Sequence, residues 1–132
     1  MRVNERMGER ATVLALALLL AGCNPDVRAA EHRAAAAMTG GVPARGPALM
    51  RSYGCASCHT IPGVVGANAL VGPPLIHMAS RGYIGGVLAN SPDNMIRWIR
   101  DPKAVDSLTA MPKLGVTERD ARDIAAYLYT LR

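Results

Sequence analysis

The stretch "YGCASCHT", residues 53–60, places two cysteines three positions apart and a histidine directly after the second. On a helical turn, side chains at i, i+3 and i+4 leave from the same side, so Cys55, Cys58 and His59 can converge on one partner. Three kinds of partner use such ligands: a zinc ion, a redox disulfide and a covalently attached haem. The rest of the chain decides among them.

The remaining sequence argues against two of the three. A structural zinc site takes four ligands and usually a second Cys or His pair, and no second pair is present. A redox-active dithiol is typical of a βαβ context and does not need the histidine. Two thiols at this spacing can instead bond the two vinyl groups on one edge of a porphyrin while the imidazole reaches the iron. The Cys-x-x-Cys-His pattern therefore predicts one haem c, attached through Cys55 and Cys58.

The first 22 residues have the features of an export signal. Three arginines in residues 1–10 precede an apolar run, residues 11–22, which is shorter than the about 20 residues that span a bilayer. The run ends in Leu-Ala-Gly before Cys23 and resembles the lipobox of bacterial lipoproteins. That resemblance implies cleavage before Cys23 and lipid attachment to its thiol. The alternative is an ordinary signal peptide followed by an incidental cysteine.

The segment after Cys23 contains an alanine run and a Gly-Gly break but no large apolar residue before Val42 other than Val27 and Met38. We expect residues 23–45 to form an acylated cysteine and a flexible tether, in which His32 is solvated, and residues 46–132 to form the haem domain. The protein would then lie at the periplasmic face of a bacterial membrane, held by its lipid.

Composition and pattern predict a small all-α domain with three main helices and long loops. The chain of 132 residues has no phenylalanine and one tryptophan, and domains of this size bury only about 60–65% of their unfolded surface, so a large apolar cofactor would supply much of the core. Helices are expected over residues 47–54, from the N-cap Ser91 to Pro102, and from the N-cap Thr117 onward. No segment alternates as a strand does.

From Gly46 onward the chain resembles a bacterial class I, monohaem cytochrome c. After the Cys-x-x-Cys-His motif, "GPPL" matches the family at Gly72, Pro73 and Leu75. The resemblance implies that the Pro73 carbonyl accepts the Nδ1 hydrogen of His59. It also implies that the first and last helices cross in contact, with Gly46 and Met50 against Tyr127.

Further positions follow from the same resemblance. Arg81 stands where the family has an arginine that neutralises a haem propionate. The stretch "MIRWIRDPKAVDSLTAM", residues 95–111, aligns without a gap and implies that Met111 is the second axial ligand and that Thr109 lies near a propionate. Trp98 replaces the tyrosine that mitochondrial members have beside the methionine sulfur. We therefore expect His59 and Met111 to bind the iron.

Other residues compete with Met111 for the sixth position. His77 and Met78 follow the proline loop closely, where the chain is still on the histidine side of the haem, and Met95 lies on the apolar face of its helix. His77 or an open coordination site is the alternative. Methionine–histidine ligation raises the reduction potential and closes the iron to small molecules, which suits electron transfer.

The expected function is single-electron transport in a respiratory chain, without enzymatic activity of its own, between a quinol-oxidising complex and a terminal oxidase. The alternatives are a haem-bearing subunit of a larger oxidase or dehydrogenase, and a haem-based gas sensor or peroxidase. With a formal charge of +5, either a ring of Arg51, Lys103 and Lys113 around the haem edge or a generally solvated basic surface is possible. Nucleic acid is not an expected partner of an exported protein.

Overall fold

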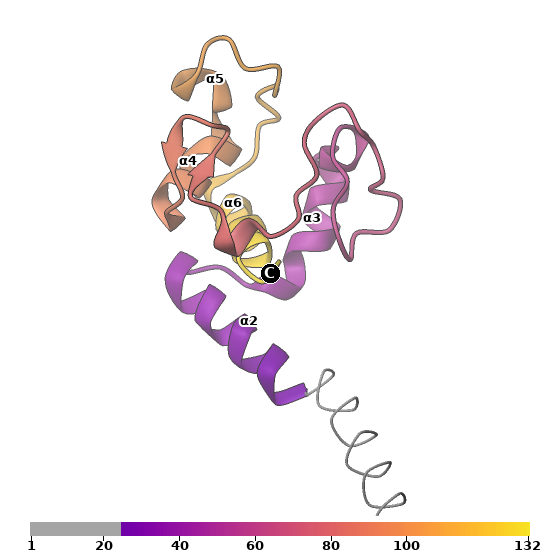
Figure 1. Cartoon of the computed structure of the whole chain (residues 1–132), viewed down its shortest axis with the longest axis vertical. Coiled ribbons are helices and arrows are strands. Elements are labelled where there is room, and N and C mark those ends of the chain that lie inside the picture. Colours follow the sequence, from indigo (N-terminus) through magenta and orange to yellow (C-terminus); the bar gives the residue numbers. More distant parts are fainter. Residues whose placement is uncertain (1–24) are drawn as a thin grey trace, which may run out of the picture. The chain divides into compact units, whose positions relative to one another are not determined.

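The computed structural model describes residues 25–132 (Figure 1), of which Glu31–Arg132 form one compact unit. The described part of the other unit, residues 25–30, is exposed helix. The helices are α2 (Pro25–Thr39), α3 (Gly46–Ser52), α4 (Pro92–Arg100), α5 (Pro102–Val105) and α6 (Glu118–Leu128), and the strands are β1 (Tyr83–Ile84) and β2 (Leu88–Ala89). Single 3₁₀ turns lie at Pro43–Arg45, Cys55–Ser57 and Met78–Ser80. The expected all-α fold is confirmed.

The predicted helix starts are confirmed by their caps. The Ser91 side chain accepts a hydrogen bond from the Asn94 amide at the start of α4, and the Thr117 side chain accepts one from the Asp120 amide at the start of α6. Each hydroxyl satisfies an amide that has no partner within its helix. Pro102 ends α4 and opens α5, which the Asp101 side chain caps through the Ala104 amide.

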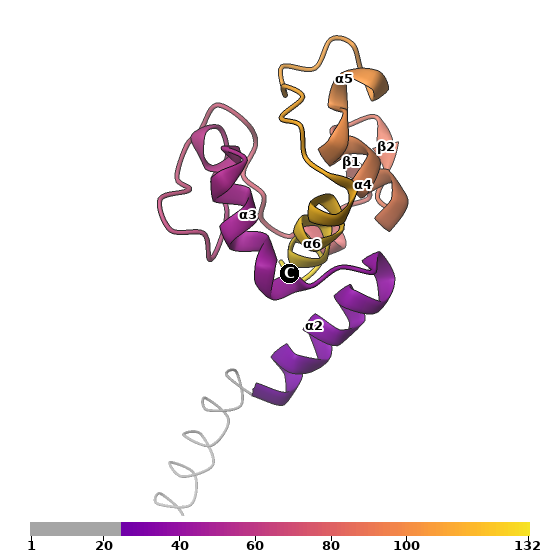
Figure 2. The same ribbon diagram turned by 180° about the vertical axis from the view of Figure 1, so that it is seen from behind.

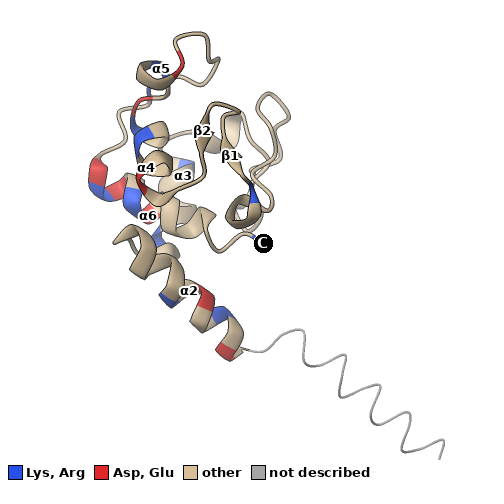
Figure 3. Cartoon of the chain, turned by 60° about the vertical axis from the view of Figure 1, so that its left-hand side comes forward, with Lys and Arg blue, Asp and Glu red and all other residues tan. Residues whose placement is uncertain are grey.

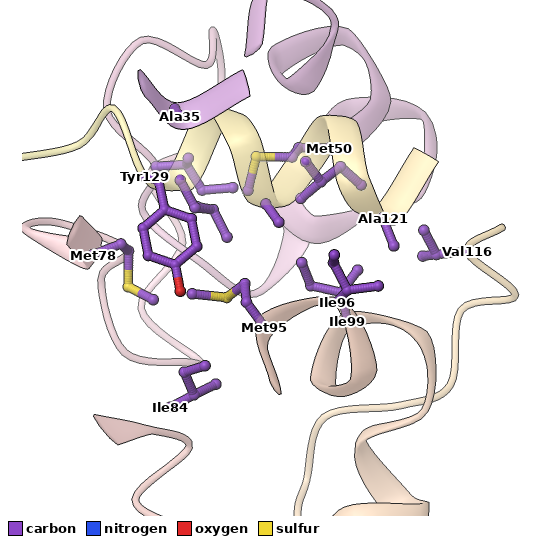
Figure 4. Packing of buried hydrophobic residues seen from close by; sticks show 14 of the residues in the cluster. Ala35, Met50, Met78, Ile84, Met95, Ile96, Ile99, Val116, Ala121 and Tyr129 are labelled. Carbon is purple, nitrogen blue, oxygen red and sulfur yellow. The ribbon is translucent and has the colours of Figure 1, made fainter. Parts of the chain in front are cut away.

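Helix α6 lies between α3 and α4 and supplies much of the core, as Figure 2 shows from behind. Its buried residues include Ala121, Ile124, Ala125 and Leu128. Facing them are Met50 of α3 and the apolar face of α4, namely Met95, Ile96 and Ile99, all buried (Figure 4). The core therefore consists mainly of aliphatic and sulfur-containing side chains, with Tyr129 as its buried aromatic residue.

The contact between α3 and α6 depends on Gly46. A Cβ at this position would overlap the Cβ of Tyr127 and come within 3.2 Å of the Asp123 carbonyl oxygen. The expected contact between a small residue of the first haem-domain helix and Tyr127 of the last is therefore present.

The structure differs from the expected flexible tether over residues 23–45. The described part contains helix α2 and a 3₁₀ turn, and Ala35, Thr39 and Pro43 are buried. Alanine has the highest helix propensity, which accounts for a helix where we expected coil. His32 lies on this helix and is partly, not fully, exposed.

Side chains of α6 hold the end of this segment. Arg122 Nη1 donates to the Thr39 carbonyl at 3.0 Å. The Asp123 carboxylate accepts from the Val42 amide at 2.7 Å and pairs with Arg45 Nε at 3.2 Å. The compact unit therefore begins at Glu31, earlier than the boundary expected at residue 46.

A second difference is the β1–β2 hairpin, in which Tyr83 pairs with Ala89 and Ile84 with Leu88. Its turn contains Gly85 and Gly86, both with positive φ, which glycine adopts at little cost. Strands of two residues are too short to produce an alternating pattern, so the sequence did not reveal them.

Candidate functional site

The Cys-x-x-Cys-His segment forms a single turn directly after α3. Gly54, at φ +80°, ends the helix and turns the chain. The amides of Cys58 and His59 both donate to the Cys55 carbonyl, at 3.2 and 3.0 Å. This turn brings both cysteines and His59 to the same side, as the spacing predicts.

The two thiols are free, and burial raises the pKa of the Cys55 thiol. Redox-active dithiols have the opposite property, a lowered pKa that favours the thiolate. Among residues 25–132, no group of three or more His, Cys, Asp or Glu side chains is placed to hold a metal ion. These observations support neither the redox nor the zinc alternative.

The backbone fixes the orientation of the His59 ring. His59 Nδ1 lies 2.7 Å from the Pro73 carbonyl oxygen. Because a carbonyl can only accept, Nδ1 must carry the hydrogen, which leaves the lone pair of Nε2 free for a metal. A Cβ at Gly72 would lie 2.5–3.0 Å from three ring atoms, so only glycine allows the chain to pass this close to the imidazole.

A cavity of about 380 Å³ lies beside this ring, within the range typical of ligand sites. Apolar side chains from α3, α4, α6 and the loops form most of its wall. Every residue predicted to bind the cofactor lines it: Cys55, Cys58, His59, Pro73, Leu75, Arg81, Trp98, Thr109 and Met111. The fold therefore brings together all nine residues, which come from widely separated parts of the sequence.

The candidates for the second axial ligand differ in position. His77 is exposed and does not line the cavity, whereas Met78 and Met95 line it but are packed in the core, 4% and 1% exposed (Figure 4). Met111 lines the cavity from a loop and is partly exposed, and its amide donates to Thr109 Oγ1 at 3.2 Å. Iron ligation by Met111 stays a prediction.

Arg81 and Trp98 are both held against the chain. Arg81 Nη2 donates to the Pro74 carbonyl at 2.6 Å and Nε to the Ile76 carbonyl at 3.2 Å. The Trp98 ring lies against Gly85, where a Cβ would come within 2.6–3.0 Å of three ring atoms.

Two further residues near the cavity were missed. Tyr129 is buried and its hydroxyl donates to Asn90 Oδ1 at 2.7 Å. Asn90 Nδ2 in turn donates to the Met78 and Arg81 carbonyls, each at 2.8 Å. Tyr129 follows the last residue of α6, outside the apolar spacing of that helix, so no periodic signal indicated its burial.

The charged residues lie mainly on α2, α4, α6 and the loop near α5, whereas the β1–β2 hairpin is uncharged (Figure 3). Both lysines expected near the haem edge are engaged within the chain. Lys113 pairs with Asp101 at 2.5 Å, and Lys103 donates to the Thr109 carbonyl at 2.7 Å.

Val71 and Tyr83 line the cavity and are 81% and 67% exposed. The rim of the cavity therefore includes solvent-exposed apolar side chains.

No helix within residues 25–132 combines the length and hydrophobicity needed to cross a bilayer. The predicted lipid attachment site, Cys23, and the signal peptide lie outside the described residues.

Comparison with known proteins gives two matches. The family model described as "Cytochrome C oxidase, cbb3-type, subunit III" matches residues 41–128. "Cytochrome c oxidase subunit 2" of Alkalihalophilus pseudofirmus is 30% identical over 89 residues, which are 67% of this chain and 25% of the relative. The chain thus spans about a quarter of the length of that relative. No solved structure matches.

Proposed function

Because the chain belongs to the cytochrome c family described as cbb3-type cytochrome c oxidase, subunit III, we propose that it transfers single electrons through one haem c at the periplasmic face of a bacterial membrane. A bound haem supplies a one-electron couple between ferric and ferrous iron. The protein controls the attachment, orientation and accessibility of that group.

The observation that carries this proposal is the convergence of four groups on one largely apolar cavity. Cys55 and Cys58 would hold the haem by two thioether bonds, and His59 would bind the iron through Nε2 because Pro73 holds its Nδ1 hydrogen. Met111 would bind from the loop after α5, and Arg81 and Thr109 would lie near the propionates.

The decisive experiment is to export the chain in a host with c-type cytochrome maturation and test whether haem survives denaturing electrophoresis. The wild-type protein should retain its haem, and the measured contents of haem and of iron should each equal one per chain. Cys55→Ala and Cys58→Ala should each lose one thioether bond, and the double variant should retain none. A wild-type chain without covalent haem would contradict the proposal.

Electron transfer to an oxidase can take place in two ways, by a separate carrier or by a subunit of the oxidase complex. We propose that the chain delivers electrons to a terminal oxidase, either as an anchored carrier or, since the family and the bacterial relative are both named as oxidase subunits, as a subunit of the complex. A dehydrogenase complex is the further alternative. After detergent extraction, a carrier should purify alone and be oxidised by the separate oxidase, whereas a subunit should co-purify in fixed ratio.

We propose that this chain relays electrons and that any catalytic centre lies in another polypeptide. A gas sensor or peroxidase needs an iron with an open or exchangeable position. Mixing the reduced protein with carbon monoxide tests this point. An unchanged spectrum is expected, and rapid formation of a carbonyl complex would favour the sensor or peroxidase.

The anchor is proposed from the lipobox-like sequence before Cys23. Cys23→Ser should move the haem protein to the soluble periplasmic fraction, or leave its signal uncleaved, while the haem spectrum stays normal. A matched control, Ser52→Ala, changes an exposed hydroxyl outside the cavity wall and should leave the membrane fraction unaltered. Normal processing with unchanged membrane association of Cys23→Ser would indicate another anchor.

A further inference from the structure

Asn90 connects the end of the β1–β2 hairpin to the wall of the cavity. Its Nδ2 donates to the carbonyls of Met78 and Arg81, both at 2.8 Å. Within the segment from Met78 to Arg81, these are the two residues whose side chains line the cavity. One amide group thus holds both ends of this short segment of the wall.

Tyr129 sets the orientation of that amide. Its hydroxyl lies 2.7 Å from Asn90 Oδ1, and Oδ1 can only accept, so the tyrosine donates. Burial raises the pKa of Tyr129 to about 12, so the hydroxyl keeps its hydrogen throughout the physiological range. With Oδ1 facing Tyr129, both N–H groups of Asn90 face the two carbonyls. Figure 4 shows the Tyr129 ring reaching from α6 toward Met78 and Met95.

Arg81 extends these contacts to the segment that holds His59. Its guanidinium donates to the Pro74 and Ile76 carbonyls, and Pro73 accepts from His59. Hydrogen bonds therefore connect the last helix, through Tyr129, Asn90 and Arg81, to the neighbours of Pro73.

We propose that Asn90 and Tyr129 are positioning residues: they fix the backbone of Arg81 and thereby keep its guanidinium, which donates to the Pro74 and Ile76 carbonyls, at the cavity, where it helps to set the reduction potential of the haem. The inference rests on the proposed function. A fixed cation beside the cavity disfavours the ferric state, which carries one more positive charge than the ferrous state. Releasing Arg81 into solvent, where its charge is screened, should therefore lower the potential.

The test is a double-mutant cycle on the haem-loaded protein. Tyr129→Phe removes the hydroxyl, and Asn90→Ala removes all three hydrogen bonds of that side chain; both should lower the midpoint potential at fixed pH. In an Arg81→Ala background, Tyr129→Phe should cause no further shift, because residues acting through one group are non-additive. Tyr127→Phe is the matched control, since its hydroxyl bonds the Pro62 carbonyl on another loop, and it should leave the potential unchanged.

Two results would overturn the proposal. One is a Tyr129→Phe variant with the wild-type potential and only a loss of thermal stability, which would make the residue merely structural. The other is an equal shift in both backgrounds, which would make it act without Arg81.

Hydrogen exchange on the folded protein gives a readout that does not depend on the reduction potential. The Ala79 amide, which donates to the Leu131 carbonyl, lies within the positioned segment, and its exchange should accelerate roughly tenfold in Tyr129→Phe, the factor that a lost hydrogen bond of ordinary strength gives. Tyr127→Phe should not produce this change. Unchanged Ala79 exchange in Tyr129→Phe would overturn the positioning role. A folded chain without covalent haem would instead contradict the proposed function, and the exchange result on that folded chain would still decide the positioning.

Discussion

Gly46 of α3 lies so close to Tyr127 of α6 that no Cβ fits between them. Gly46→Ala would force the two helices apart or displace the tyrosine. We expect this substitution to lower the free energy of unfolding by about 1–3 kcal/mol, as overpacking typically does, in denaturant titration of the haem protein. Gly82→Ala is the control, because a Cβ at Gly82 meets nothing within 4 Å. Equal effects of the two substitutions would refute the contact.

Met111 decides between an electron carrier and a ligand-binding haem protein. Met111→Ala should abolish the weak long-wavelength charge-transfer band expected of a ferric thioether complex, lower the potential and let reduced iron bind carbon monoxide, while the haem stays attached. Met78→Ala removes a buried side chain and should cost about 2–5 kcal/mol of stability but keep the band. Loss of the band in the Met78 variant alone would show that the axial assignment is wrong.

The haem should be part of the core. Without haem, the largely apolar wall of the cavity of about 380 Å³, including Met50, Met95 and Ile124, would face water, and a small domain has a total stability of only about 5–15 kcal/mol. The Cys55→Ala, Cys58→Ala double variant made without haem should therefore show little helix by circular dichroism. Cooperative melting from full helix content would contradict this expectation.

The hydrogen bond from Tyr53 should make the stability of the folded protein depend on pH in the acidic range. Its hydroxyl donates to Asp120 Oδ2 at 2.7 Å, and this bond, followed by that of Thr117, lowers the pKa of Asp120 from its ordinary 3.8. A carboxyl group whose pKa is lowered by folding stabilises the folded protein at pH values above its ordinary pKa. That stabilisation is lost as the pH falls through the folded-state pKa.

We therefore expect Tyr53→Phe to melt below wild type at pH 7 and the gap in melting temperature to narrow as the pH falls below 3.8. Tyr127→Phe loses a bond to a carbonyl, which does not titrate, so its gap should stay constant. If the difference in melting temperature between Tyr53→Phe and wild type were equally large in acid, stability would not be linked to the protonation of Asp120.

Much of the fold follows from local chemistry that the sequence displays directly. Ser91, Thr117 and Pro102 mark helix ends because a hydroxyl cap and a missing amide act within one turn. The spacing of Cys55, Cys58 and His59 indicates their convergence for the same reason. The other cavity residues were placed by resemblance to a family, because no local rule relates Pro73 or Arg81 to a histidine many residues away.

What the sequence did not reveal depends on partners distant in the chain. Residues 31–45 join the compact unit through Arg122 and Asp123, yet their own composition is that of a linker. Asn90, which is partly buried, and Tyr129, which is buried, are polar residues whose contact is possible only once the hairpin and the end of α6 lie together. Hydrophobic periodicity reports which face of an element is buried, but it does not report which polar groups will meet.

The cavity wall contains four thioethers, from Met50, Met78, Met95 and Met111. Oxidation converts methionine to a polar sulfoxide, and its rate depends on access. Met50, Met78 and Met95 are at most 4% exposed, whereas Met111 is partly exposed. Whenever the Met111 sulfur leaves the iron, peroxide would therefore reach it before the other three. The earliest oxidative damage to the cavity wall would then be a loss of the protein's redox properties while the fold, still built on three intact core methionines, persists.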